Sequence, residues 1–342
     1  MEPLNEMSLP TQMRAVVWFG PGDVRVENRP VPHIKPGQSL VKVALSGICA
    51  TDRELIDGRL PGISPGVIPG HEITGTIVSG AKGHPANIGD RVVVDTYLPC
   101  DRCELCREGR PEYCLDPGEL GFTSDGGWAE YVLVSDNRLH AIPDSISDAE
   151  AVIAEPFAMT LGAFLDCGRS VEGQNVLIIG SGMAAVGFAC SAIAQGALHV
   201  QVCLKSNERA PVFQRINPRI DIILSENIRP GAADVGIDSI GSPESIQSAI
   251  YGTRRKGLVI CYGLSHQVVD AFPLGDVVLR NITLAGHTNP HDVWPILVTY
   301  LRDGLLSTGG FVDGFISIDE VPERMMLRSK ALRTVIDMRA HP

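Results

Sequence analysis

The sequence lacks long apolar runs, an excess of basic residues and the features of a signal peptide. No apolar stretch reaches the ~18 residues that a membrane-spanning helix needs, so we expect no membrane partner. The net charge of −11 argues against nucleic-acid binding, which depends on basic patches. Met1 to Met13 is polar and contains neither a basic nor an apolar leader region. We therefore expect a cytoplasmic protein that binds neither nucleic acid nor membrane.

Nine cysteines are present, and four of them form a compact pattern. In a reducing cytoplasm, regular cysteine spacing indicates metal binding more often than disulfides. Two intervals of two residues and one of seven separate the four, which predicts a closed tetrahedral zinc site with a structural role. These four residues are Cys100, Cys103, Cys106 and Cys114.

A second set of metal-binding side chains is dispersed along the chain. His71 and Glu72 follow Gly70, so their side chains can turn toward one ion. With Cys49 upstream and Glu155 downstream they offer one thiolate, one imidazole and two carboxylates, a set that suits zinc with an open position. The alternative is a surface histidine beside a solvated glutamate.

The chain is long enough for two domains, and its pattern changes near residue 148. Before that point, short alternating strands are separated by Gly and Pro with no long amphipathic helix between them. This pattern predicts a barrel-like antiparallel β domain that carries the metal. The expected strands are Ala15 to Phe19, Val24 to Val26, Ser39 to Val43, Thr74 to Val78 and Arg91 to Val94.

After that point, a helical stretch from Ala149 to Cys167 precedes an apolar strand, Asn175 to Ile179, and a glycine turn. A strand, a glycine turn and a helix N-terminus bind pyrophosphate through backbone amides. Ala185 replaces the third glycine of the fingerprint, where only close packing is needed. The alternative is a tight turn without a ligand. The predicted cofactor-binding residues of this turn are Gly180, Gly182, Met183 and Ala184.

The next strand, His199 to Leu204, ends without the acid that binds the ribose hydroxyls of NAD. Lys205, Ser206 and Arg209 follow it and could hydrogen-bond a 2′-phosphate. The turn therefore favours NADP, and the alternative is a solvated basic loop.

Further strands alternate with helical stretches, which predicts a doubly wound parallel sheet, the Rossmann arrangement. Only ten residues separate two of these strands, too few for an ordinary helical crossover, so we expect a loop or a single turn there. A helix from Val293 and two late strands complete the chain. The expected later strands are Ile220 to Leu224, Val235 to Ser239, Gly257 to Tyr262, Ile282 to Ala285, Gly314 to Ile318 and Leu332 to Met338.

Together these motifs resemble the zinc-dependent medium-chain alcohol and polyol dehydrogenases, which include sorbitol, threonine and cyclitol dehydrogenases. The resemblance extends from Met13 to Asp337. Besides the two cysteine-containing sites and the glycine turn, it rests on Gly47-Ile48-Cys49, Gly70-His71-Glu72, Gly89-Asp90-Arg91-Val92, Gly127-Trp128-Ala129-Glu130-Tyr131 and Glu155-Pro156.

The resemblance implies roles for individual residues. Cys49 and His71 would bind the catalytic zinc, with Glu72 or Glu155 as third ligand and the other carboxylate near the metal-bound water. Thr51 would pass on the substrate proton, and Asp52 would support the ligands. Glu54 stands where the family often has a relay histidine, which leaves the proton exit route open. The catalytic residues are thus expected to be Thr51, Glu54 and Glu155.

The resemblance also implies hydride transfer between a nicotinamide cofactor and a secondary alcohol or ketone. The expected domains are 1–148, completed by 288–342, and 149–287, and we expect a homodimer or homotetramer. The alternatives are an NAD-dependent polyol or cyclitol dehydrogenase and a non-catalytic zinc-stabilised dinucleotide-binding module. Candidate substrate-lining residues are Arg53, Glu54, Leu60 to Val67, Thr96, Tyr97, Phe122, His287 and Asn289.

Overall fold

The computed structural model describes residues 9–80, 86–264, 272–290, 292–327 and 331–340. Residues 1–8 lie outside these described ranges. They are the first part of the segment Met1 to Met13, in which the sequence predicts no signal peptide. The chain divides into two compact units, and the domain boundaries expected from the sequence, 148 and 288, stay predictions beside this division. Unit 1 comprises Met1–Leu98, Asp116–Val152 and Val312–Pro342, and unit 2 comprises Pro99–Leu115 and Ile153–Phe311.

Unit 1 is built on a seven-stranded sheet with the order β16-β17-β3-β4-β5-β9, in which β8 also pairs with β3. Its pairs are antiparallel except β16 with β17. The late strands thus join the sheet formed by the first part of the chain. The strands are β3 (Gln38–Ile48), β4 (Ile73–Ser79), β5 (Arg91–Val94), β8 (Tyr131–Ser135), β9 (Leu139–Ala141), β16 (Gly314–Ile316) and β17 (Thr334–Asp337).

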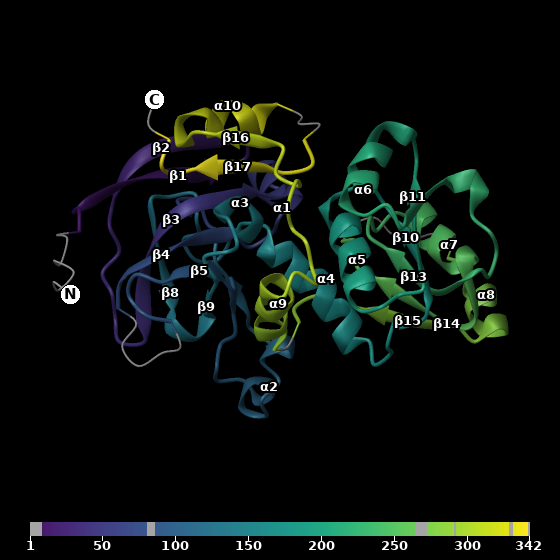
Figure 1. The fold of residues 1–342 in the computed structure, drawn as a ribbon. Helices are drawn as coiled ribbons and strands as arrows, with labels where there is room; N and C mark the ends of the chain where they lie inside the picture. Colours follow the sequence, from purple (N-terminus) through teal and green to yellow (C-terminus); the bar gives the residue numbers. More distant parts are fainter. Residues whose placement is uncertain (1–8, 81–85, 265–271, 291, 328–330, 341–342) are drawn as a thin grey trace. The chain divides into compact units, whose positions relative to one another are not determined.

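Unit 1 also contains two two-stranded sheets and several short helices, of which α1, α3 and α10 are labelled in Figure 1. The two-stranded sheets pair β1 with β2 and β6 with β7. Sequence reasoning did not predict the helices α1 and α10. These elements are β1 (Gln12–Gly20), β2 (Asp23–Pro30), β6 (Tyr97–Leu98), β7 (Gly118–Glu119), α1 (Ala50–Ile56), α3 (Asp148–Ala151) and α10 (Val321–Met326).

The core of unit 1 brings two loops into close contact. Trp128 is fully buried, and a Cβ atom added to Gly70 would lie only 2.3 Å from its Cδ1 atom. Gly70 also has a φ of 99°, a conformation that favours glycine. A Cβ atom on Gly121 would lie 2.9 Å from the backbone of Gly70. Glycines at these positions therefore allow the loop before His71 to pack on the segment that ends at Trp128.

Unit 2 contains a six-stranded parallel sheet with the order β12-β11-β10-β13-β14-β15. Helices α5 and α6 lie on one face, and α7 and α8 lie on the other (Figure 1). The predicted fold class, a Rossmann sheet with a separate antiparallel β domain, is confirmed. The elements are β10 (Asn175–Ile179), α5 (Met183–Ala194), β11 (His199–Leu204), α6 (Ala210–Ile216), β12 (Ile220–Leu224), β13 (Ala233–Asp238), α7 (Pro243–Gly252), β14 (Thr253–Cys261), α8 (Leu274–Arg280) and β15 (Thr283–Gly286).

The short crossover between β12 and β13 contains one 3-10 turn, η4 (Ser225–Asn227), as the sequence predicts. Ile228 follows it and is 8% exposed, in a core cluster with Leu177, Ile246 and Ile250. Ile228 thus packs against the sheet residue Leu177 and against Ile246 and Ile250 of α7, where the side chains of a crossover helix would otherwise pack.

The predicted helix from Ala149 to Cys167 is instead two helices, α3 in unit 1 and α4 (Ala154–Asp166) in unit 2. Ser147 caps α3, because its hydroxyl accepts a hydrogen bond from the amide of Glu150. Pro156 is the third residue of α4. Proline has no amide hydrogen and is tolerated only in the first turn of a helix, so a new helix begins just before it.

The helix expected from Val293 is α9 (Val293–Arg302), which belongs to unit 2.

In the part of the chain that the structure covers, no helix has both the length and the apolar character needed to span a bilayer.

Candidate metal and cofactor sites

The ligand atoms of Cys49, His71 and Glu72 lie within 4.8 Å of one another in unit 1. His71 is 4% exposed and Glu72 is fully buried, whereas Cys49 is half-buried. The structure thus places together three of the four residues that the sequence predicts as ligands of the catalytic metal.

The junction between β3 and α1 positions the thiol. Strand β3 ends at Ile48, and Cys49 is the N-cap of α1. The Oδ2 atom of Asp52 accepts a hydrogen bond of 2.7 Å from the amide of Cys49. Its Oδ1 atom lies 3.3 Å from the Nδ1 atom of His71. A carboxylate on one ring nitrogen orients the imidazole and leaves the other nitrogen available to a metal, so Asp52 positions both residues.

Backbone contacts fix Glu72 beside β3. Gly47 donates a hydrogen bond of 2.8 Å from its amide to the carbonyl of Glu72, and the Ser46 hydroxyl donates to the same carbonyl. A Cβ atom on Gly47 would lie 2.0 Å from the Oε2 atom of Glu72. Because of this clash, only glycine at position 47 leaves room for the Glu72 carboxylate. The Trp128 indole also donates a hydrogen bond to the carbonyl of Gly47.

Arg333 neutralises the buried carboxylate. Its Nη1 atom lies 2.9 Å from the Oε1 atom of Glu72, with the two side chains 4% and 0% exposed. The same nitrogen donates a hydrogen bond of 2.8 Å to the carbonyl of Ile48. The guanidinium thus links the end of β3 to the metal-binding carboxylate.

The environment shifts the pKa values of all three candidate ligands. Burial raises the pKa of the Cys49 thiol, but the hydrogen bond and charge of His71 outweigh it, so the net shift is downward. Burial lowers the pKa of His71, but the charges and hydrogen bonds of Asp52 and Cys49 together outweigh it and raise this pKa well above its ordinary value. Burial raises the pKa of Glu72 against the opposing charge of Arg333.

These groups fit a divalent cation. A thiolate at Cys49 and the carboxylates of Asp52 and Glu72 carry three negative charges, and Arg333 carries one positive charge. A divalent cation beside a neutral His71 balances the two remaining negative charges. Without such a cation, a protonated His71 imidazole must supply part of the positive charge. Both carboxylate oxygens of Glu72 are buried without a hydrogen bond. One thiolate, one imidazole and one carboxylate form a donor set that zinc accepts.

Helix α1 also carries Thr51 and Glu54. The Thr51 hydroxyl lies 3.7 Å from the Cys49 sulfur. Glu54 is half-buried and three residues further along, a spacing that puts both side chains on one helix face. Arg53, a candidate substrate-lining residue, instead donates a hydrogen bond of 2.8 Å to the carbonyl of Leu327.

Glu155 is the second residue of α4 in unit 2 and is half-buried. Its predicted roles, as a zinc ligand or as a carboxylate near the metal-bound water, stay predictions. Of these two candidate carboxylates, only Glu72 shares unit 1 with Cys49 and His71.

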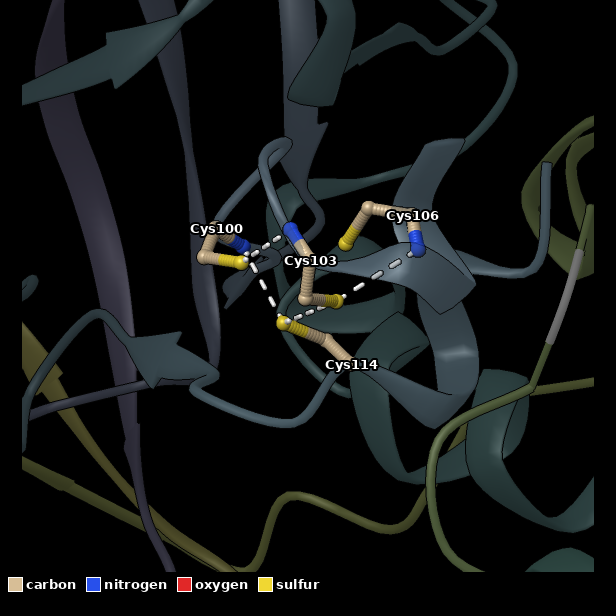
Figure 2. Close-up of side chains that lie close together, drawn as sticks. All are labelled: Cys100, Cys103, Cys106 and Cys114. Atoms are coloured by element: carbon tan, nitrogen blue, oxygen red, sulfur yellow. Dashed lines mark hydrogen bonds between the residues drawn. The ribbon is translucent and has the colours of Figure 1, made fainter. Parts of the chain in front are cut away.

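The four cysteines of the lobe in unit 2 converge on one point (Figure 2). Their sulfurs lie within 4.8 Å of one another, and those of Cys103 and Cys114 are 4.0 Å apart. Tetrahedral zinc with bonds of ~2.3 Å separates its sulfur ligands by ~3.8 Å. None of these four cysteines forms a disulfide, so the cluster needs little rearrangement to close around zinc.

Backbone amides surround these thiols. The amide of Cys103 donates to the sulfur of Cys100 at 3.3 Å, and the amide of Cys106 donates to that of Cys103 at 3.5 Å. Hydrogen bonds from the amides of Leu115 and Cys106 lower the pKa of Cys103 to about 6. Amide donors favour the thiolate form, which is the form that binds zinc.

In unit 2, the glycine turn lies between β10 and α5. Gly182 is the N-cap of α5 and no side chain caps this end, so its first amides remain available to an anion. A Cβ atom on Gly182 would meet nothing within 4 Å, whereas one on Gly180 would lie 2.1 Å from the Ser239 hydroxyl. Open space at an uncapped helix N-terminus fits a pyrophosphate.

The end of β11 reaches this turn. Leu204 is 1% exposed and offers no acceptor, while Lys205 and Ser206 are exposed. Arg209 is half-buried and donates a hydrogen bond of 3.1 Å from its Nη1 atom to the carbonyl of Ser181. The residues predicted to bind a 2′-phosphate therefore lie beside the glycine turn.

Sequence reasoning missed Arg333 and a carboxylate near His71, Glu119. Arg333 directly precedes the last strand, and nothing in the local pattern distinguishes it from a surface arginine. Glu119 lies on a two-residue strand between Pro- and Gly-rich segments. The positions of both residues depend on strand pairing between distant segments, which a local pattern does not contain.

The buried pair gives a stability prediction. Replacing Arg333 with leucine leaves Glu72 buried without its counter-ion, so we expect a loss of about 3 to 5 kcal/mol in the free energy of unfolding. Arg339→Leu is the control, because Arg339 is 53% exposed in its pairs with Asp148 and Asp337 and should cost at most about 1 kcal/mol. Denaturant unfolding measures both.

Adding Glu72→Gln to Arg333→Leu should recover part of this loss, because the uncompensated charge disappears. Equal costs for Arg333→Leu and Arg339→Leu would show that the buried pair contributes nothing particular.

Comparison with known proteins agrees with this arrangement. The Alcohol dehydrogenase GroES-like domain family matches residues 35–144. D-arabinitol dehydrogenase 1 from Uromyces fabae is 28% identical over 93% of this chain and 94% of its own length. Sorbitol dehydrogenase from Bacillus subtilis (strain 168) has the same identity and coverage.

Solved structures agree as well. A zinc-binding dehydrogenase from Sinorhizobium meliloti 1021 bound to NADP superposes with a TM-score of 0.89 at 26% identity, covering 96% of this chain and all of the other. The resemblance predicted from the motifs is thereby confirmed: the chain is an oxidoreductase that is similar over nearly its whole length to the zinc-dependent medium-chain alcohol and polyol dehydrogenases.

Proposed function

We propose that this enzyme is a zinc-dependent oxidoreductase that transfers hydride between a nicotinamide cofactor and a secondary alcohol or ketone. The observation that carries the proposal is the buried cluster of Cys49, His71 and Glu72, whose ligand atoms converge within 4.8 Å. Its negative groups require a divalent cation in addition to Arg333. The resemblance adds support, because the named relatives act on sugar alcohols.

In this proposal, the chain's own residues hold the metal and move the proton. Cys49, His71 and Glu72 would hold the zinc, with Glu155 as the alternative third ligand. Zinc would supply Lewis acidity that lowers the pKa of an alcohol. Thr51 accepts the alcohol proton through its hydroxyl. Glu54, one helical turn further along α1, passes it toward solvent and replaces the relay histidine common in the family.

The substrate we propose is polar and hydroxylated, because the relatives with the same coverage are D-arabinitol and sorbitol dehydrogenases. We infer that NADP is the preferred cofactor, and the S. meliloti structure contains NADP. Cells usually hold the NADP pool reduced, so ketone reduction is then the favoured direction. The second candidate is NAD-dependent polyol oxidation on the same site. The cytoplasmic location stays a prediction.

We further propose two zinc ions per chain. Elemental analysis should find two in active protein. Mild chelation should abolish activity before it unfolds the protein, because the four-cysteine site has no open position. Cys49→Ser should retain one zinc and the dinucleotide affinity of the unmodified enzyme, measured by fluorescence titration, since Cys49 and the glycine turn belong to different units. Active protein with fewer than two zinc ions would contradict the proposal.

The cofactor proposal predicts at least about tenfold higher kcat/KM with NADP than with NAD. Each charge-assisted hydrogen bond to a 2′-phosphate contributes about 1.5 to 3 kcal/mol before solvent screening, and ~1.4 kcal/mol suffices for tenfold. Lys205→Ala should lower kcat/KM with NADP alone. Leu204→Asp with Lys205→Ala should shift the preference toward NAD, because it adds the missing acceptor.

Lys42→Ala is the control for these variants, because Lys42 is an exposed lysine of unit 1. Steady-state kinetics with both cofactors provides the measurement. Equal efficiency, or a preference for NAD in the unmodified enzyme, would reduce this turn to a solvated basic loop.

We propose a homodimer, or a homotetramer built from such dimers, that pairs through β15. This strand is the sheet edge, and no other described strand pairs with its outer side. Helix α8, which directly precedes β15 in the chain, has no buried residue, and its Val278 and Leu279 are 63% and 73% exposed. A free edge beside exposed apolar side chains favours pairing with a second copy.

Light scattering should therefore give at least twice the chain mass. Leu279→Asp should lower it toward one chain, because the charge would be buried in the interface. Leu115→Asp, at a residue of the cysteine lobe with 65% exposure, should not. A monomeric unmodified protein would exclude this interface.

A further inference from the structure

The chain turns sharply beside the metal cluster of unit 1, at Glu119 to Thr123. The amides of Phe122 and Thr123 donate to the carbonyl of Glu119 at 3.3 and 3.0 Å, and the amide of Leu120 donates to the carbonyl of Thr96. The ring of Phe122 lies against the imidazole of His71, with 5.1 Å between the centroids. The turn therefore borders a metal-binding side chain.

Strand pairing fixes the direction of the Glu119 side chain. Glu119 on β7 lies directly opposite Tyr97 on β6, and opposite residues of an antiparallel pair share one face. Leu120, the next residue, is 4% exposed and packs in the core. Glu119 is the last residue of β7, so its side chain lies on the same face of the strand pair as that of Tyr97.

Glu119 is half-buried. Its amide and carbonyl bond within the turn and to Thr123. Its carboxylate, however, receives no hydrogen bond and forms no ion pair with any residue in the part of the chain that the structure describes. A partly desolvated carboxylate without a partner is costly unless a ligand or water supplies donors.

The charges of the metal cluster act on this group. Burial raises the pKa of Glu119, the charge of His71 opposes that shift, and the charges of Asp52 and Asp95 add to it. Glu119 thus lies within the electrostatic field of a candidate zinc ligand and of the carboxylate that positions this ligand. A molecule held at the metal would lie near it.

Resting on the proposed dehydrogenase function, we propose that Glu119 determines substrate specificity by accepting a hydrogen bond from a hydroxyl group other than the one that reacts. The substrate then carries at least two hydroxyl groups and is a polyol, or the corresponding hydroxyketone, rather than a simple alcohol. A site built to hydrogen-bond a hydroxyl rejects the analogue without it, because its polar group is left unpaired. The proton that reacts still leaves through Thr51.

The test compares xylitol with 2-pentanol, which share a five-carbon chain and differ in the number of hydroxyl groups. Glu119→Leu removes the acceptor and should lower kcat/KM for xylitol at least about tenfold. It should leave kcat/KM for 2-pentanol within about twofold. Glu119→Gln keeps an acceptor oxygen, so its kcat/KM for xylitol should lie between that of the unmodified enzyme and that of Glu119→Leu. Glu27→Leu on β2 is the control and should change neither value.

Two measurements separate a contact with the substrate from structural damage. Zinc content by elemental analysis and dinucleotide affinity by fluorescence titration should be unchanged in Glu119→Leu. Calorimetry should show weaker xylitol binding to its dinucleotide complex. Equal losses on both substrates, loss of zinc from the variant, or unchanged xylitol kinetics would each overturn the assignment.

Failure of the Glu119 assignment can be distinguished from failure of the proposed dehydrogenase function. An unmodified enzyme that uses 2-pentanol but not erythritol, xylitol or sorbitol excludes the role of Glu119 and leaves the dehydrogenase intact. An unmodified, zinc-loaded enzyme that binds no dinucleotide and oxidises no alcohol removes both proposals.

Discussion

The ion pair between Arg333 and Glu72 is the interaction on which the metal site of unit 1 depends. A carboxylate without any exposed surface is tolerated only with a counter-charge, and breaking such a pair by removing one partner is costly. The guanidinium supplies one positive charge, while the thiol and two carboxylates around it can carry three negative ones. This imbalance is the physical reason to expect a divalent cation. The same excess of negative charge around His71 raises the pKa of its imidazole.

The same cluster explains why residues distant in sequence are needed together. Cys49 follows the end of β3, His71 and Glu72 precede β4, and Arg333 precedes β17. Because β3 pairs with both β4 and β17, the hydrogen-bonded register of one sheet brings the ends of these strands together. The antiparallel sheet thus determines the geometry of the site, and the glycines at 47 and 70 allow the backbones to approach closely enough.

Local sequence patterns predicted what depends on local geometry. The four cysteines, the adjacent His71 and Glu72, and the strand and glycine turn before α5 could all be assigned because their spacing alone implies a metal or an anion. Arg333 and Glu119 could not, because strand pairing between distant segments determines where each of them lies. The helical stretch expected from Ala149 to Cys167 is helical but divides into α3 and α4, a break for which Pro156 carried the signal. The roles of Glu155 and of Lys205 stay predictions, since they concern ligands that the fold alone does not identify.

The position of Arg333 near the end of the chain also sets the order of events during synthesis. Domains tend to fold as units while the chain is still being made, and the residues of unit 2 are complete at Phe311. The sheet of unit 1 lacks β16, β17 and its buried guanidinium until Arg333 and the strand after it have been translated. We therefore expect the Cys49 cluster to be completed after all residues of unit 2 have been made, and a chain truncated before Arg333 would lack the counter-ion of Glu72.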